Sequence, residues 1–333
     1  MHGENDNMRI GVVGCGLIGW KRVSVLGKDH PVVIVADVQK DRAEKMAKQL
    51  GSAGATDNWQ QVTTHPDVDT VFVATTHDVL SQISLSAVQS GKHVLVEKPG
   101  ARNAAELQPV VDMAKKMNVI VKVGFNHRFH PGMQKAKEIV DSGVLGPLMF
   151  IRGRYGHGGR PGYEKEWRAD PQVSGGGELL DQGMHLIDLS WWFLGDLSAA
   201  GGFIHTYFWN MPADDNAFML LKSPANQVAW LHVSWTEWKN TFSFEIYGRD
   251  GKLHIEGLGG SYGVERLYYY KMLPEMGPPE TVIYEYPGKD LSWELEFKDF
   301  CDAIAAGRQP CGNLDDALAA LKIVENLYKG YHS

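Results

Sequence analysis

Residues 9–37 read RIGVVGCGLIGWKRVSVLGKDHPVVIVAD, and this stretch decides the fold. It joins two short β-branched runs, 9–13 and 32–36, through a segment of helical character. Similar runs follow at 70–75 and 93–97 and are again separated by helical segments. Because these runs are apolar on both faces, helices should cover both sides of a parallel sheet. The sequence therefore predicts a doubly wound α/β domain over residues 1–125.

The turn after the first run is Gly14-Cys15-Gly16-Leu17-Ile18-Gly19, a G-x-G-x-x-G between a strand and a helix. In that context the motif is typical of a dinucleotide-binding loop. Gly14 permits the tight turn, Gly16 lets the backbone approach a pyrophosphate, and Gly19 allows close packing of helix on strand. A merely structural glycine turn is the alternative. The expected cofactor contacts in this loop are Gly14, Gly16, Leu17, Ile18 and Gly19.

The second run ends at Asp37, about 20 residues after the loop, where a carboxylate can accept hydrogen bonds from an adenosine ribose. A 2'-phosphate would meet a like charge there, which favours NAD over NADP. Lys40 and Arg42 follow closely, so limited NADP use stays open. The alternative for Asp37 is a solvated residue at the end of a strand.

The composition points to a small-molecule enzyme. The 333 residues carry a formal net charge of −7, which gives no electrostatic reason to expect binding to nucleic acid or an anionic membrane. Three cysteines without ligand spacing indicate neither disulfides nor a zinc site. Neither an apolar stretch in the first ten residues nor an apolar run of membrane-spanning length is present, so we expect a cytoplasmic protein.

Residues 126–333 are predicted to form a second, substrate-binding and oligomerisation domain. Alternating runs at 229–236 and 242–247 indicate antiparallel sheet, and helices are expected near 292–306 and 314–329. This sheet is rich in large aromatics: Trp230, Trp235, Trp238, Phe242, Phe244 and Tyr268 to Tyr270. They either form a face for a partner subunit, giving a homodimer or homotetramer, or pack under helices of the same chain.

Lys98 is the first candidate catalytic residue. It lies in GKHVLVEKP, residues 91–99, at the carboxyl end of a predicted strand, where open α/β folds bind ligands. Its ammonium group could stabilise a developing alkoxide, and a surface lysine is the alternative.

The second candidate is the segment SGGGELLDQGMHLID, residues 174–188, which the pattern predicts as a mostly buried helix. Asp181, His185 and Asp188 can share one face of it. A carboxylate beside an imidazole can fix its tautomer and suit it to proton transfer, whereas a lone buried histidine is more often a satisfied core residue.

In chain order, the motifs are GCGLIG, GKHVLVEKP, GFNHRF at 124–129 and GGGELLDQGMHLID. Together they resemble the family of glucose-fructose oxidoreductase, inositol dehydrogenase and MocA (Gfo/Idh/MocA). The resemblance implies a Rossmann domain followed by an α/β domain with a large, open, mainly antiparallel sheet that often forms dimers or tetramers. Matching the motifs residue by residue implies that Lys98, Asp181 and His185 are catalytic. Substrate contacts are expected, by position, at Asn126, His127, Arg128 and Arg168 in addition to the catalytic three. Further cofactor contacts are expected at Thr75, Thr76, His77, Glu97 and Lys98.

Two positions depart from the family pattern. Many members have Pro-Asn after the fourth strand, where this chain has Thr76-His77. Gly100 after Glu-Lys-Pro also departs from it.

The resulting hypothesis is an NAD-dependent dehydrogenase that moves a hydride between nicotinamide and a hydroxyl-bearing carbon of a sugar, sugar derivative, nucleotide sugar or cyclitol. His185 would remove the hydroxyl proton while Lys98 and Asp181 stabilise and orient the reacting atoms. The loop 154–168 mixes Arg, Gly and aromatic residues and could close over a polyol, or it is an ordinary surface loop. One alternative is a redox-neutral epimerase or glycoside-cleaving enzyme with the same site, and another is a non-catalytic NAD-binding sensor. The histidines 127, 130, 157 and 185 match no standard metal motif, so no metal is expected.

Overall fold

A computed structural model of the chain describes residues 7–51 and 53–331. The N-terminal composition that argued against a signal peptide falls mostly on residues 1–6, outside the described residues. The chain divides into two compact units. The first comprises the residues up to Phe125 together with Trp293–Leu318, and the second comprises Asn126–Ser292 and the residues from Ala319 onward. Each unit is described by itself.

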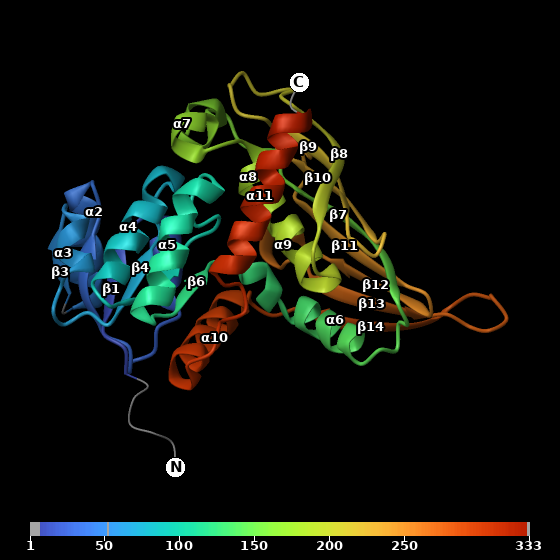
Figure 1. Cartoon of the computed structure of the whole chain (residues 1–333), viewed down its shortest axis with the longest axis horizontal. Helices are drawn as coiled ribbons and strands as arrows, with labels where there is room; N and C mark the ends of the chain where they lie inside the picture. Colours follow the sequence, from blue (N-terminus) through green and yellow to red (C-terminus); the bar gives the residue numbers. More distant parts are fainter. Residues whose placement is uncertain (1–6, 52, 332–333) are drawn as a thin grey trace, which may run out of the picture. The chain divides into compact units, whose positions relative to one another are not determined.

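A six-stranded parallel sheet of order β3-β2-β1-β4-β5-β6 forms the centre of the first unit (Figure 1). The strands are β1 (Ile10–Val13), β2 (Val32–Ala36), β3 (Gly54–Thr56), β4 (Thr70–Val73), β5 (His93–Val96) and β6 (Val121–Val123). The connecting helices are α1 (Leu17–Ser24), α2 (Lys40–Leu50), α3 (Trp59–Thr63), α4 (His77–Gln89) and α5 (Ala104–Met117). The predicted doubly wound parallel sheet is confirmed. The sequence did not predict β3 and β6, whose three residues each are too few to show a periodic pattern.

Part of the C-terminal region, which the sequence analysis assigned to a second domain of 126–333, packs with this first unit. Helix α10 (Ser292–Ala306) places Phe297, Phe300 and Ala303 in the core beneath the sheet, with residues of α1 and α2. Phe300 and Ala303 are fully buried there, and the Phe297 ring meets that of Phe72 edge-on at 5.9 Å. The physical reason is that these apolar groups cover one face of the sheet, a role that local sequence does not reveal.

The second unit is built on an eight-stranded sheet of order β14-β13-β12-β11-β7-β10-β9-β8. Its strands are β7 (Leu148–Gly156), β8 (Ser198–His205), β9 (Asn216–Lys222), β10 (Val228–Ser234), β11 (Thr241–Gly248), β12 (Gly251–Glu256), β13 (Glu265–Lys271) and β14 (Glu280–Tyr286). Neighbouring strands pair antiparallel except β7 and β10, which pair parallel. The predicted large, mainly antiparallel sheet is confirmed.

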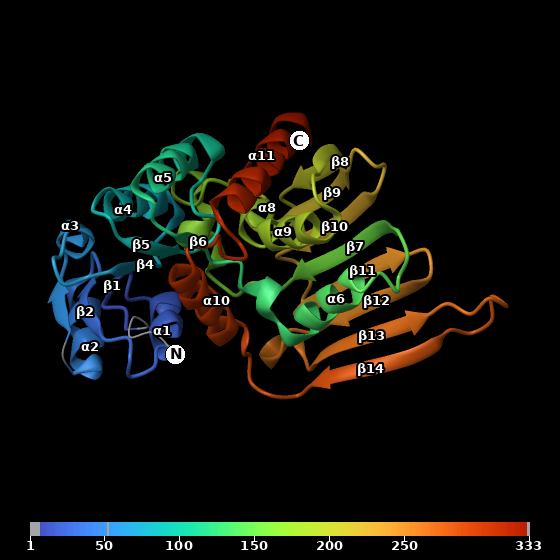
Figure 2. The same cartoon turned by 60° about the horizontal axis from the view of Figure 1, so that its bottom comes forward.

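Helices cover one face of this sheet (Figure 2), and among the described residues none lies on the other face (Figure 1). Helix α9 (Gly183–Leu194) packs on β7 and β10, and α6 (Pro131–Asp141) packs on β12, β13 and β14. The last helix, α11 (Leu314–Tyr331), runs from the first unit into the second.

The aromatic residues that the sequence grouped together fall into a buried set and an exposed set. Trp235, Phe242 and Phe244 are buried, whereas Trp230 is 56% exposed on the other face, and Trp238 follows the end of β10 and is 65% exposed.

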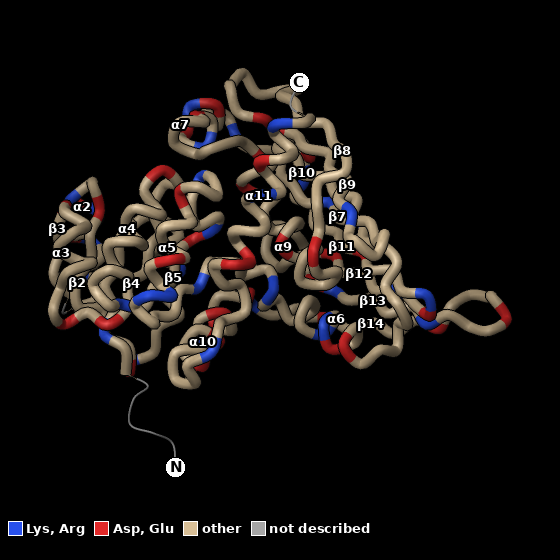
Figure 3. Tube along the Cα trace, in the orientation of Figure 1, with Lys and Arg blue, Asp and Glu red and all other residues tan. Residues whose placement is uncertain are grey.

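Basic and acidic residues are interspersed along the trace of the described residues rather than gathered by sign (Figure 3). No helix among them is both long and apolar enough to cross a bilayer.

Candidate active site

The glycine loop has the close packing that its sequence predicted. Gly14 has a φ of +99°, and a Cβ atom there would clash with the backbone of Ala74 after β4. A Cβ on Gly19 would clash with the carbonyl of Gly14, so helix α1 lies directly against the loop. A Cβ on Gly16 would meet nothing within 4 Å. The loop is therefore tight on its inner side and open in front of Gly16, where the first-turn amides of α1 are suited to a pyrophosphate.

Asp37 lies beside this loop at the end of β2. Its Oδ2 accepts a hydrogen bond from the backbone N–H of Cys15 at 2.8 Å, and its Oδ1 accepts one from that of Gln39 at 2.9 Å. Each carboxylate oxygen keeps further acceptor capacity for a ribose hydroxyl. Burial, and then the charge of Asp37, raise the pKa of the Cys15 thiol to about 12, so this cysteine stays protonated beside the loop. The fixed carboxylate fits an adenosine ribose without a 2'-phosphate.

The segment that replaces the family's Pro-Asn begins helix α4. Thr76 is the residue before the helix, and its hydroxyl donates to the Asp78 carboxylate at 2.6 Å. His77 is the first helical residue and is buried, while the Thr75 hydroxyl donates to the carbonyl of Thr76 at 3.1 Å. Thr76 and His77 thus form a polar N-terminus of α4. This N-terminus lies beside the glycine loop, because Ala74 contacts Gly14.

Lys98 follows β5 in a tight turn, in which the backbone N–H of Gly100 donates to the carbonyl of Glu97 at 2.9 Å. Gly100, which departs from the family pattern, has a φ of +85°, a left-handed conformation that favours glycine. Lys98 is half-buried.

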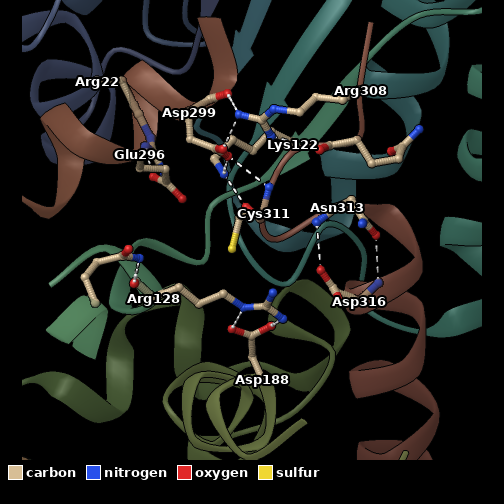
Figure 4. A network of polar contacts seen from close by, with 12 residues as sticks. Arg22, Lys122, Arg128, Asp188, Glu296, Asp299, Arg308, Cys311, Asn313 and Asp316 are labelled. Atoms are coloured by element: carbon tan, nitrogen blue, oxygen red, sulfur yellow. Dashed lines mark hydrogen bonds and ion pairs between the residues drawn. The ribbon is translucent and has the colours of Figure 1, made fainter. Parts of the chain in front are cut away.

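The carboxylate of Glu97 points to the protein interior. It accepts a hydrogen bond from Nε of Arg22 at 2.6 Å, and Arg22 is 1% exposed on helix α1. Arg22 also pairs with the fully buried Glu296 of α10 (Figure 4). Its guanidinium lies 4.4 Å from the Trp293 ring centroid. Glu97 therefore ties the Lys98 turn to the helix that begins at the glycine loop. The sequence analysis missed Arg22 and Glu296, because a charge at a core-facing position of a helix shows its partner only in the fold.

In the second unit, the predicted helix over 174–188 is interrupted, which corrects that expectation. Helix α7 (Pro171–Ser174) ends, and Gly175 takes a φ of +83°. The short helix α8 (Glu178–Asp181) and then the twelve-residue helix α9 follow. Gly175 has a positive φ, and side chains do not fit at Gly176 and Gly177. A Cβ on Gly177 would clash with the backbone of Asp214, and one on Gly176 with the hydroxyl of Tyr328.

Asp214 holds the start of α8. Its buried carboxylate accepts hydrogen bonds from the backbone N–H groups of Gly177 and Leu179, both at 2.9 Å, and from the Tyr328 hydroxyl at 2.7 Å. Burial raises the pKa of the Asp214 carboxyl, although these donors oppose the shift. Asp214 and Tyr328 thus position the short helix that ends at Asp181. The sequence analysis missed both, because their partners lie at least 35 residues away.

Asp181 pairs with another predicted site residue. Nε of Arg168 donates to its Oδ2 at 3.0 Å, and the Arg168 guanidinium lies 4.5 Å from the Trp167 ring centroid. Burial lowers the pKa of the Arg168 guanidinium, but the Asp181 carboxylate raises it, and the pKa is raised overall. The structure brings these two predicted residues together from the loop after β7 and from α8.

His185 is buried in the first turn of α9, and its ring stacks on that of His127. The ring centroids are 3.8 Å apart and the planes differ by 22°. Tyr155 of β7 packs against both rings, at 5.1 Å from His127 and 6.2 Å from His185. Nδ1 of His127 lies 3.2 Å from Oδ1 of Asn126, and Nδ2 of Asn126 donates to the Ser292 hydroxyl at 2.9 Å. Asn126 and His127 thus lie in one buried polar group with His185.

Arg128 and Asp188 form a separate buried ion pair. Nε and Nη2 of Arg128 donate to the two Asp188 oxygens at 2.8 and 2.6 Å, and both side chains are almost fully buried (Figure 4). This pair joins the 124–129 segment to α9. Asp188, which the sequence placed on one helix face with Asp181 and His185, thus serves to anchor α9 through Arg128.

Within the described residues, no group of three or more His, Cys, Asp or Glu side chains is arranged to hold a metal ion.

The glycine loop, the carboxylate that fits a ribose and the parallel sheet define a dinucleotide-binding oxidoreductase domain. Residues 8–125 match the sequence model of the oxidoreductase family with an NAD-binding Rossmann fold, and residues 133–254 match that of the GFO/IDH/MocA C-terminal domain. The chain belongs to the GFO/IDH/MocA family, and the resemblance seen in its motifs is confirmed.

Relatives of this chain include several sugar and cyclitol dehydrogenases. Levoglucosan dehydrogenase of Pseudarthrobacter phenanthrenivorans is 27% identical over 62% of this chain and 56% of that protein. The scyllo-inositol 2-dehydrogenase (NAD(+)) of Bacillus subtilis is 25% identical over 95% of this chain and 92% of that protein. The solved structure of levoglucosan dehydrogenase in complex with NADH and levoglucosan has a TM-score of 0.85 at 22% identity and covers 98% of both chains, which shows the same fold. The alignment with the first relative spans little more than half of that protein's length.

Proposed function

We propose that this protein is an NAD-dependent dehydrogenase that oxidises a hydroxyl-bearing carbon of a sugar, sugar derivative, nucleotide sugar or cyclitol. The observation that carries the proposal is the arrangement in the second unit, where a buried imidazole, His185, lies in the first turn of the helix that follows the Arg168–Asp181 ion pair. Membership of the family supports it, and so do relatives named as levoglucosan, inositol and glucoside dehydrogenases.

Bound NAD supplies the hydride acceptor. The open front of Gly16 and the first turn of α1 hold its pyrophosphate, and Asp37 holds its adenosine ribose. The start of α4, next to the glycine loop, supplies the remaining cofactor contacts of this segment, Thr75, Thr76 and His77.

His185 accepts the proton of the substrate hydroxyl as that carbon is oxidised. Lys98 stabilises the negative charge that develops on the same oxygen, and Arg168 holds Asp181 in place to orient the substrate. The assignment of these three residues to one reaction rests on the family's motif and on the chemistry of their side chains. Asn126 and His127 keep the His185 ring fixed by stacking and hydrogen bonding.

A screen of sugars, cyclitols and nucleotide sugars for NADH formation tests the function. Net NADH production with at least one of them is expected, and it should be lost in the His185→Ala variant. Conversion of substrate without net NADH would instead favour the redox-neutral epimerase or glycoside-cleaving alternative. Tight NAD binding with no conversion of any tested compound would favour the non-catalytic sensor.

We further propose that the helix-free face of the eight-stranded sheet joins two copies of the chain in a homodimer or homotetramer in the cytoplasm. Trp230 is 56% exposed on this face, and Ile283 of β14 and Phe203 of β8 are 56% and 46% exposed. Large exposed apolar side chains on one sheet face are typical of a subunit interface. The family's frequent use of its open sheet for assembly supports the same proposal.

A further inference from the structure

Four aromatic side chains, Tyr163, Phe208, Trp209 and Trp238, form a cluster that we call the aromatic rim. They come from three loops, 157–170 after β7, 206–215 between β8 and β9, and 235–240 between β10 and β11. All three loops leave the same end of the sheet. The register pairs Gly156 with Ser234 and Thr241, and Asn216 with Ser234 and His205.

The rings of the aromatic rim contact one another in series. Centroid distances are 5.7 Å from Tyr163 to Trp209, 5.2 Å from Trp209 to Phe208, and 4.7 Å from Phe208 to Trp238. The indole N–H of Trp209 donates to the carbonyl of Trp235 at 3.0 Å, which fixes that ring. A Cβ on Gly159 would lie 2.6 Å from the Trp209 ring, so the glycine lets the loop backbone approach the ring closely.

The outer end of the aromatic rim is exposed. Phe208 is 58% and Trp238 is 65% exposed, although both are large apolar side chains. Trp238 also has a φ of +53°, which is unfavourable for a residue with a bulky side chain. Exposed apolar groups and strained backbone of this kind concentrate at binding sites.

The inner end of the aromatic rim reaches the candidate active site. Tyr163 lies in the same loop as Arg168, five residues before it, and Nε of Arg168 donates to Oδ2 of Asp181 at 3.0 Å. Burial raises the pKa of the Tyr163 hydroxyl, and the Asp181 carboxylate adds to the shift. Charged groups line the same path. Nη2 of Arg160 pairs with Oε1 of Glu166 at 2.5 Å, and the Arg160 guanidinium lies 5.7 Å from the Tyr163 ring centroid. The centre of a subunit interface is depleted in charged residues, whereas a ligand site combines aromatic surface with a few polar groups.

We propose that the aromatic rim is a subsite for the second pyranose ring of a glycoside whose first ring is oxidised beside Asp181 and His185. This inference rests on the proposed function and adds the substrate class. A pyranose ring has faces of C–H groups and a rim of hydroxyls. The faces of Phe208 and Trp238 suit the C–H groups, and Arg160 and Glu166 suit the hydroxyls. A free monosaccharide or cyclitol does not reach this subsite.

The test compares glucose with maltose and cellobiose in the NADH-loaded protein, by calorimetric titration, and in the NAD-loaded protein, by NADH formation. At least one disaccharide should bind about tenfold more tightly than glucose, since about 1.4 kcal/mol corresponds to a factor of ten and matches one aromatic ring contact. The ratio of disaccharide to glucose affinity should fall to near one in Trp238→Ala and decrease in Phe208→Ala. Met276→Ala is the matched control, because Met276 is also exposed and has a φ of +56°, but lies between β13 and β14.

Each outcome decides the proposal. An unchanged affinity ratio in Trp238→Ala and Phe208→Ala would overturn it, as would disaccharides that bind no more tightly than glucose. If the variants changed the oligomeric mass but not the ratio, the aromatic rim would be an interface between copies and the subsite would be rejected. The titrations need no turnover, so selective disaccharide binding without NADH formation would support the subsite while favouring the non-catalytic sensor over the proposed dehydrogenase.

Discussion

The preference of this protein for NAD should depend on one carboxylate, that of Asp37. The residue lies at the end of β2 with its oxygens fixed by the N–H groups of Cys15 and Gln39, so it cannot turn away from an added 2'-phosphate. Two unit charges about 4 Å apart repel by about 4 kcal/mol at an effective dielectric constant of about 20. Screening by salt and solvent lowers this value, and a remaining 3 kcal/mol or so corresponds to a factor of about 10² in affinity. The wild-type protein should therefore bind NADH about 10²-fold more tightly than NADPH.

The substitution Asp37→Asn isolates the charge. An asparagine keeps one carbonyl oxygen that can accept from the Cys15 N–H at nearly the same place, while its NH2 group cannot accept from the Gln39 N–H. The repulsion is therefore removed and the contact to the glycine loop is kept. NADPH affinity should rise, and NADH affinity should fall by the loss of a charge-assisted hydrogen bond, about 1.5–3 kcal/mol. Fluorescence titrations of both cofactors measure this, with Asp41→Asn on the exposed first turn of α2 as the control. Equal affinities of the wild-type protein for NADH and NADPH would refute the reasoning, as would an unchanged ratio in Asp37→Asn.

Four further outcomes are expected. The His185→Ala and Lys98→Ala variants should each lower kcat by about 10²- to 10⁴-fold with little change in NAD affinity, and the double variant should lose much less than the product, as steady-state kinetics would show. Tyr328→Phe should lower the free energy of unfolding by about 1–3 kcal/mol in urea, because the buried Asp214 carboxylate loses a donor at 2.7 Å. Trp230→Glu should shift the mass measured by light scattering toward the monomer, and an unchanged mass would exclude the sheet face as the interface. Burial, and then Arg154, lower the pKa of His232 from 6.5 to about 4. The unfolded chain therefore takes up a proton between these values that the folded chain does not, so stability should fall as the pH drops through this range, and less so in His232→Gln.

The parallel sheet could be predicted from sequence because its central strands are uniform apolar runs next to glycines with evident roles. Gly14 and Gly19 each lie where a Cβ would clash with backbone, so local sequence carries the geometry of the loop. The two edge strands, of three residues each, gave no such signal. Helix α10 was predicted, but not the sheet face that it covers, because Phe297 and Phe300 find their partners almost the whole chain away.

The sequence predicted which residues belong to the candidate site better than it predicted how they are arranged. Asp181 and His185 were expected on one continuous helix, whereas the chain breaks between α8 and α9. Local periodicity also does not reveal where α8 starts, because the contact that fixes Gly177 is with Asp214, 37 residues away. Arg128 was expected to contact the substrate, and its buried ion pair with Asp188 was not predicted from the sequence.

The return of α10 to the first unit affects how this protein can fold while it is being made. Domains generally fold as units during synthesis, from the N-terminus onward. Here the sheet of β1 to β6 is complete by Val123, but Phe297, Phe300 and Ala303, which cover one of its faces, leave the ribosome only after the whole second sheet. A nascent chain that stops before residue 293 therefore exposes this apolar face to chaperones, and a fragment cut at Phe125 should aggregate unless α10 is supplied as a separate peptide.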